Sequence, residues 1–314
     1  MTRRYRNAAL FVALAAIWGS AFVVTKVGLR HLPPTLFAAL RFDLAAVLLF
    51  GYVAATKAEW RPRTGDDWLY PLAGGLFAIA GHHAFLFAGQ QYVSSGVAAV
   101  LLGLVPIVTP AFTRVFSTGE RLSPTGAAGL GLGFLGVVVI ASPDPSDLLS
   151  SDLLGVALVL VSAVVFAFGA VFTHSRAPDL SLVATQAWMM AVGAVALHVA
   201  SVLLPTESVA AAAWTPEALG AVAYLGAVAG ALGFTLYFSL LDRIGPIEAS
   251  LIEYVIPLFA ALAGWLALGE RVTATTVAGF VVILSGFLLM KRRAIAEDVL
   301  GRRGRRAERP SADD

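Results

Sequence analysis

The chain has 314 residues, of which 58% are hydrophobic and 13% charged, with a formal net charge of +2 and no cysteine. Soluble domains average about 25% charged residues, so this composition excludes an ordinary soluble protein and indicates an integral membrane protein. The small net charge argues against nucleic-acid binding, and the absence of cysteine excludes disulfides and thiol-based zinc sites.

Apolar segments of membrane-spanning length follow one another along the whole chain. A helix needs about 20 mostly apolar residues to cross the hydrocarbon core of a bilayer. The connections are short and rich in Pro, Gly, Ser or Asp, so none can hold a soluble domain. We therefore predict an all-α integral membrane protein with ten transmembrane helices, at residues 7–29, 35–55, 68–88, 94–114, 124–141, 152–173, 181–203, 217–240, 246–268 and 273–290.

The first of these segments has an alternative interpretation as a cleaved signal peptide, because RRYR precedes it and small residues follow at Gly19. Its apolar character continues to Leu29, well past that cleavage-like site, which favours a transmembrane helix.

The distribution of Lys and Arg predicts the orientation of the chain. If the N-terminus is inside, the inner loops and tails hold 18 of the 22 basic residues, and the outer loops hold only Arg30 and Arg271. Cytoplasmic loops carry such an excess, so we expect both termini in the cytoplasm, with residues 291–314 as a basic, disordered cytoplasmic tail. Lys26 and Arg41 lie within predicted spans, and Lys26 is expected to extend to the membrane surface.

The second half of the chain resembles the first. GERLSPTGAAGLGLGFLG at 119–136 aligns with GERVTATTVAGFVVILSG at 269–286, an offset of 150, and WGSAF around Gly19 aligns with FGAVF around Gly169. Each half contains five spans, and an odd number places the two copies in opposite orientations. Such inverted repeats occur in secondary transporters, which bind substrate near the membrane midplane and open this site alternately to the two sides of the membrane. The predicted repeats cover residues 7–141 and 152–290.

These features together resemble a known family. The five-plus-five spans, the WGSAF first helix, the Arg41-Phe42 pair and the two GER hairpins are similar to the drug/metabolite transporter superfamily, specifically its EamA-like branch. The resemblance covers residues 7–290. It implies a secondary transporter in the cell membrane, without a bound cofactor, that often exports amino acids, metabolites or drug-like compounds. It leaves the solute, proton coupling and the choice between monomer and homodimer open.

Glu253 is the leading candidate for a functional residue. It lies about seven residues inside the ninth predicted span, and Pro257 leaves its carbonyl without the usual helical partner. An ionisable side chain at that depth is costly, which makes it a functional hypothesis. We predict binding of a substrate amine or proton coupling for Glu253; a structural hydrogen bond is the alternative. Glu248, one turn earlier, suits a role at the helix N-terminus.

Further candidates are polar or amphipathic side chains within other spans. His82 and His83 are adjacent in sequence, so their side chains point about 100° apart on a helix, and this is not the spacing of two metal ligands on one helix face. At least one of them is expected to line a polar cavity. A proton-linked role is open, because histidine titrates near neutral pH. Three roles are open for Arg41: it extends to the outer interface, pairs with a helix C-terminus, or binds a substrate carboxylate. The remaining pocket candidates have apolar bodies and polar tips: Trp18, Tyr237, Tyr254 and Gln186.

The repeated GER tripeptides are predicted to form tight hairpins at the membrane surface rather than to touch substrate. The glycines suit helix C-caps, and the acid–base pairs would hold the turns. The residues concerned are Gly119, Glu120 and Arg121 in the first half and Gly269, Glu270 and Arg271 in the second. The Gly-rich fifth span predicts close helix packing, within one chain or, less directly, in a dimer.

Other functions find less support in the sequence. A membrane-embedded enzyme acting on a lipid or isoprenoid is the main alternative, and it would need acids, histidines or metal ligands clustered at one depth. Glu253 and His82 differ by about 10 Å in predicted depth. The chain has neither a P-loop for ATP nor an H-E-x-x-H motif, and the repeat gives no reason to predict a channel.

Overall fold

The computed structural model describes residues 3–116, 124–142, 150–174, 179–205, 207–244 and 252–307. Within these ranges the regular structure is entirely helical. In the part of the chain that the structure describes, eight helices are long and apolar enough to cross a membrane, and two shorter apolar helices cover Ile252–Leu268 and Ala274–Met290. The predicted class, an all-α integral membrane protein, is confirmed.

The helices follow the predicted segments closely. The first half contains α1 (Arg3–Gly28), α2 (Pro34–Thr56), a continuous helix made of α3 (Gly65–Ala73), η1 (Gly74–Gly81) and α4 (His82–Gln90), then α5 (Ser95–Leu102), α6 (Val105–Phe116) and α7 (Pro124–Ala141). The second half contains α8 (Ser151–His174), α9 (Leu182–Leu203), the short η2 (Val209–Ala211), a continuous helix made of α10 (Pro216–Ala223), η3 (Tyr224–Leu232) and α11 (Gly233–Ile244), then α13 (Ile252–Leu268) and α14 (Ala274–Ala307). Helix α14 thus extends into the segment that the sequence assigns to a tail.

The third helix of each half contains a π-helical stretch. In the first half it is η1, starting at Gly74, and in the second half it is η3, starting at Tyr224, 150 positions later. Stretches of π-helix are uncommon and often occur at functional sites. The repeat in the sequence therefore extends to a matched local distortion of the backbone.

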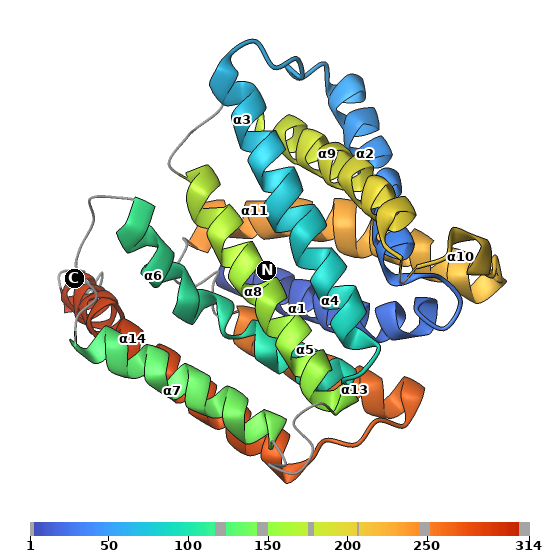
Figure 1. Ribbon diagram of the computed structural model, residues 1–314. Coiled ribbons are helices and arrows are strands. Elements are labelled where there is room, and N and C mark those ends of the chain that lie inside the picture. The colour runs from blue at the N-terminus through green and yellow to red at the C-terminus, as the bar shows by residue number, and fades with distance from the viewer. Residues whose placement is uncertain are drawn as a thin grey trace.

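The two halves interlock rather than forming separate bundles. Helix α1 packs mainly on α13, α2 on α9 and α4 on α8, so the main contacts of each half are with the other half (Figure 1). The pairs α2–α9 and α7–α14 join corresponding helices of the two halves. The interior of the molecule is therefore built from helices of both repeats.

Helices α7 and α14 lie side by side along their length (Figure 1) and meet through glycines. A Cβ atom added to Gly129 would lie 2.5 Å from the carbonyl oxygen of Gly286, and one added to Gly136 would lie 2.7 Å from that of Gly279. The repeat relates these two contacts to each other, because the offset of 150 maps Gly129 onto Gly279 and Gly136 onto Gly286. The glycines thus have a packing role inside a single chain, as expected for close helix contacts.

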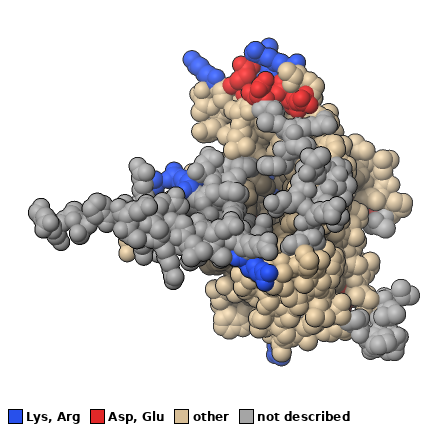
Figure 2. Space-filling model, turned by 90° about the vertical axis from the view of Figure 1, so that its left-hand side faces the viewer, with Lys and Arg blue, Asp and Glu red and all other residues tan. Residues whose placement is uncertain are grey.

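Charged side chains gather at one end of the face seen in Figure 2, over the connection between α2 and α3, while most of the described surface below is uncharged. This connection exposes Lys57, Glu59, Arg61 and Arg63, and Arg63 Nη2 lies 2.9 Å from Glu59 Oε1. Large apolar side chains are exposed along the helices, such as Val202 at 75%. Apolar sides with a charged end are what a surface in contact with lipid requires.

Candidate functional site

A central cavity lies among helices of both halves. Its empty volume is about 990 Å³ when its open side is included. The wall is predominantly apolar and aromatic, with a few polar groups. The aromatic side chains are Trp18, Phe22, Phe87, Phe166, Phe234 and Tyr237, and the polar ones are Thr25, Arg41, His82, His83, Gln90 and Glu253.

The cavity brings together most of the residues that the sequence singles out. Glu253 comes from α13, His82 and His83 from α4, and Arg41 from α2, while α1 and α11 contribute two aromatic side chains, Trp18 and Tyr237. The sequence places Glu253 and His82 at different depths, yet both border this one cavity. No group of three His, Cys, Asp or Glu side chains arranged to hold a metal occurs among the described residues.

Two candidates, Tyr254 and Gln186, are absent from the cavity wall. The Tyr254 hydroxyl donates to the Gly103 carbonyl at 3.3 Å, and its ring packs on Phe287 with centroids 4.6 Å apart. Gln186 is buried in α9 at 6% exposure. Tyr254 therefore packs between helices, and Gln186 is buried without lining the cavity.

Arg41 lies in the interior of the protein. Arg41 is only 7% exposed. Its guanidinium carbon lies 4.6 Å from the ring centre of Phe42 and 5.6 Å from that of Phe87. The Nε atom of Arg41 is buried without a hydrogen-bond partner. This burial contradicts the interpretation that Arg41 extends to the outer interface.

The two histidines are held by different partners. His82 Nδ1 lies 2.7 Å from the Ser162 hydroxyl of α8, and His83 Nδ1 lies 2.9 Å from the Ile79 carbonyl in η1 of its own helix. A carbonyl can only accept, so Nδ1 of His83 donates in this bond. The two rings meet edge to face with centroids 4.4 Å apart. Both rings therefore have fixed positions at the cavity wall.

Trp18 connects α1 to the second π-helical stretch. Its indole Nε1 donates to the Ala229 carbonyl of η3 at 3.1 Å. The ring packs against Phe234 and Tyr237, with centroids 5.6 Å and 5.4 Å away. A partly buried indole N–H usually finds such an acceptor, and the bond fixes how Trp18 presents its apolar face to the cavity.

Glu253 lies in the first turn of α13, as the structure describes this helix, and is partly exposed to the cavity. Among the described residues, no basic side chain forms an ion pair with it. The predicted depth of Glu253 and the predicted role of Glu248 depend on residues 245–251, which lie outside the described ranges.

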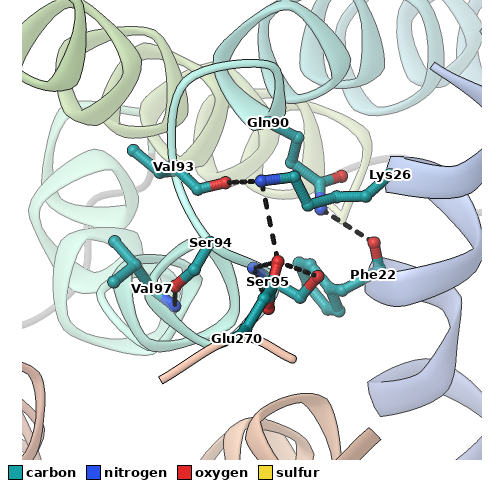
Figure 3. Close-up of polar contacts among 8 residues, drawn as sticks. All are labelled: Phe22, Lys26, Gln90, Val93, Ser94, Ser95, Val97 and Glu270. Atoms are coloured by element: carbon teal, nitrogen blue, oxygen red, sulfur yellow. Dashed lines mark hydrogen bonds and ion pairs between the residues drawn. The ribbon is translucent and has the colours of Figure 1, made fainter. Parts of the chain in front are cut away.

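A polar network ties three elements together beside the cavity (Figure 3). Lys26 Nζ of α1 donates to the Val93 carbonyl at 2.7 Å and lies 3.6 Å from the Glu270 carboxylate. That carboxylate accepts from the Ser95 backbone N–H at 3.0 Å and from its hydroxyl at 3.3 Å. We call Lys26, Val93, Ser95 and Glu270 the closure network.

The local sequence explains how Glu270 reaches this position. Gly269 has a positive φ of 67° at the end of α13, and Thr273 Oγ1 accepts from the Thr276 N–H at the start of α14. The tight hairpin between them directs Glu270 to the N-terminus of α5, where a carboxylate is favoured. The equivalent hairpin residues of the first half, Gly119, Glu120 and Arg121, lie outside the described residues.

The closure network adjoins one end of the cavity. Thr25, the residue before Lys26, lines the cavity, as does Gln90, whose side-chain amide donates to the Phe22 carbonyl at 3.2 Å. The sequence does not predict this link, since it assigns Lys26 to the membrane surface and Glu270 to a hairpin. The only available signal is that the predicted topology places both residues on one side of the membrane.

Apolar helices from two interlocked halves around an amphipathic cavity define a multi-pass membrane protein with an interior cavity. The model of the EamA-like transporter family matches residues 6–142 and again residues 153–292. The chain therefore belongs to the EamA-like transporter family, and the predicted membership and cell-membrane location are confirmed.

Known relatives extend along nearly the whole chain. The uncharacterized inner membrane transporter YedA of Escherichia coli K12 is 30% identical over 92% of this chain and 94% of its own length. A probable amino-acid metabolite efflux pump of Salmonella typhimurium is 30% identical over 99% of this chain and 100% of its own. The uncharacterized transporter YoaV of Bacillus subtilis is 28% identical over 88% and 94%, respectively. A crystal structure of another protein shares the fold, with a TM-score of 0.60 at 20% identity over 93% of this chain and 99% of that one.

Proposed function

We propose that this EamA-family protein is a secondary active transporter that exports a small organic solute by alternating access. The proposal is carried by a cavity that both halves border and that adjoins the closure network, which we take to close its outer end. A site between two halves that is closed on one side is what alternating access requires. The name of the Salmonella relative, an efflux pump, supports export.

The proposed topology has ten transmembrane helices in two inverted repeats, with both termini in the cytoplasm. The excess of Lys and Arg on one side supports this orientation. The closure network then faces the outside. A reporter fused after Ser142 is expected to read as external and one at the C-terminus as cytoplasmic; a cytoplasmic reading after Ser142 would overturn the inversion.

Repeat-related glycines make different contacts in the two halves, which supports exchange between two states. A Cβ atom added to Gly19 would lie 2.5 Å from Cβ of Phe259 in α13, whereas one added to Gly169 would lie 2.8 Å from Cβ of Phe77 in η1. If the halves exchanged these arrangements, α1 would move away from α13. The outer end of the cavity would then open while the inner end closed.

Glu253 is proposed as the acidic group of the cavity that binds the coupling proton. It borders the cavity and forms no ion pair with a described basic residue, so its carboxylate is available to bind a proton. Acids in such positions serve proton relays in membrane transporters. Binding of a substrate amine is the competing role for the same carboxylate.

The proposal is tested with purified protein in liposomes without ATP. A panel of labelled amino acids, amines, nucleosides and organic anions should yield at least one solute with saturable counterflow. Glu253→Gln should retain counterflow of that solute and lose transport driven by a pH gradient; loss of binding instead would assign Glu253 to the substrate. Turnover of a lipid without flux of any solute would support the enzyme alternative and contradict transport.

A further inference from the structure

The Arg41 side chain is a buried cation at the cavity wall without an acidic partner among the described residues. It lies in α2 at 7% exposure, and its Nε atom has no hydrogen-bond partner. The nearest acid along the helix, Asp43, is engaged elsewhere, since its carboxylate lies 2.7 Å from His198 Nε2. The protein itself therefore leaves the positive charge of Arg41 unneutralised in this part of the structure.

The contacts that Arg41 does make offset only part of the cost of its burial. The rings of Phe42 and Phe87 lie within cation–π distance, at 4.6 Å and 5.6 Å from the guanidinium carbon. Such contacts are weaker than the loss of hydration of a buried ion, which is repaid only by a counter-charge in good geometry. A ligand that brings an anion would supply that counter-charge.

Glu253 does not supply the missing charge, although it borders the same cavity. Helix α2 packs mainly on α9, η3 and α4, whereas α13 packs mainly on α1 and α5, so the two residues approach the cavity from different helices. No ion pair joins them. The ionisable side chains that interact with Arg41 at the cavity wall are His82 and His83, which carry no negative charge.

We propose that Arg41 binds the carboxylate of the cargo, so that the transported solute is a small organic anion with an aromatic or apolar body. The planar guanidinium matches a carboxylate with two parallel hydrogen bonds. Aromatic side chains, among them Phe22, Phe166 and Phe234, form the wall that receives the rest of the molecule. This assignment rests on the proposed transport function and adds the chemical class of the substrate.

Three probes with the same aromatic body separate the contributions of charge. They are 3-phenylpropionate with a carboxylate, 3-phenylpropanol without charge, and 2-phenylethylamine with an amine. Binding to the purified full-length protein is measured by isothermal titration calorimetry. The carboxylate should bind about tenfold or more tightly than the alcohol, as expected for a charge-assisted pair. Equal or weaker binding of the carboxylate would overturn the assignment.

Variants identify Arg41 as the residue responsible. Arg41→Gln should reduce binding of 3-phenylpropionate to the level of the alcohol and leave the alcohol unchanged, which also shows that the variant is folded. Arg41→Lys should retain an intermediate preference, because it keeps the charge without the planar fork. The exposed Arg30→Gln serves as the matched control and should behave as the unmodified protein. Undiminished carboxylate binding in Arg41→Gln would contradict the proposal.

The same probes distinguish a failure of this assignment from a failure of transport. If the amine or the alcohol is exchanged across the liposome membrane and the carboxylate is not, the assignment of an anionic cargo is wrong, but the proposed transport function is supported. If the carboxylate binds through Arg41 but no solute of the wider panel exchanges, the site stands and the transport function falls.

Discussion

Lys26 Nζ lies 3.6 Å from the carboxylate of Glu270, which joins α1 to the hairpin that precedes α14. The two residues come from opposite halves of the chain, 244 positions apart (270 minus 26). Both side chains are mostly buried, at 24% and 16% exposure, so the pair is less screened than a surface salt bridge. The same carboxylate accepts a hydrogen bond from the Ser95 N–H at the start of α5. Glu270 therefore takes part in both an ion pair and a hydrogen bond at a helix N-terminus.

Glu270→Gln should therefore destabilise the protein more than Lys26→Met does. The glutamate contributes both the ion pair and the N-terminal interaction with α5, and its loss should cost about 1–2 kcal/mol. Loss of Lys26 should cost about 1 kcal/mol or less, since Glu270 keeps its bonds to Ser95. Thermal unfolding in detergent measures the difference. The control is Arg271→Gln, an exposed neighbour, which should change little; an equal effect of all three variants would remove the special role of Glu270.

Ser162→Ala should destabilise the contact between α4 and α8. The Ser162 hydroxyl is fully buried and lies 2.7 Å from His82 Nδ1. Removing it leaves a buried polar atom with a poorer partner, at a cost of about 1–3 kcal/mol. The matched control is Ser285→Ala, because that hydroxyl is exposed and donates to the Val281 carbonyl of its own helix. Similar unfolding temperatures for the two variants would show that the His82 bond contributes little.

Gly136→Ala should destabilise the pair α7–α14, whereas Gly131→Ala in the same helix should not. A Cβ atom at Gly136 would lie 2.6 Å from a side-chain carbon of Ile283 and 2.7 Å from the Gly279 carbonyl, while at Gly131 it would meet nothing within 4 Å. Overpacking of this kind costs about 1–3 kcal/mol, and the exposed position should gain from the better helix propensity of Ala. Thermal unfolding of both variants tests this; equal stability would mean that the two helices can separate slightly without cost.

The positions of the helices could be predicted because length and hydropathy largely determine a membrane span. The predicted segment 35–55 compares with α2 at Pro34–Thr56, and 181–203 with α9 at Leu182–Leu203. The π-helical stretches could not be predicted in this way. In η1, for instance, Gly74 and Gly75 face Met189 and Val192 of α9, so tertiary packing accompanies the distortion.

The candidate site was partly predictable for a related reason. Ionisable groups inside spans are rare, so Glu253, His82, His83 and Arg41 stood out, and all four border the cavity. No such sequence signal exists for side chains whose role depends on which distant segments contact each other in the folded protein. Tyr254 turned to Gly103 and Phe287 instead of the cavity, and the contact between Lys26 and Glu270 depends on how two distant connections lie together.

The most direct test of alternating access is the reaction of one cavity cysteine from each side of the membrane. The chain has no native cysteine, and the small, partly exposed Ala21 lines the cavity, so Ala21→Cys places a single thiol there. In the otherwise unmodified protein, a membrane-impermeant maleimide should label it slowly from outside and readily from the cytoplasmic side. Adding Glu270→Gln should raise the external rate several-fold and lower the internal rate, while Arg30→Cys, in a loop that the proposed topology places outside, should react equally in both backgrounds. A rise of both rates, or no change in either, would contradict alternating access.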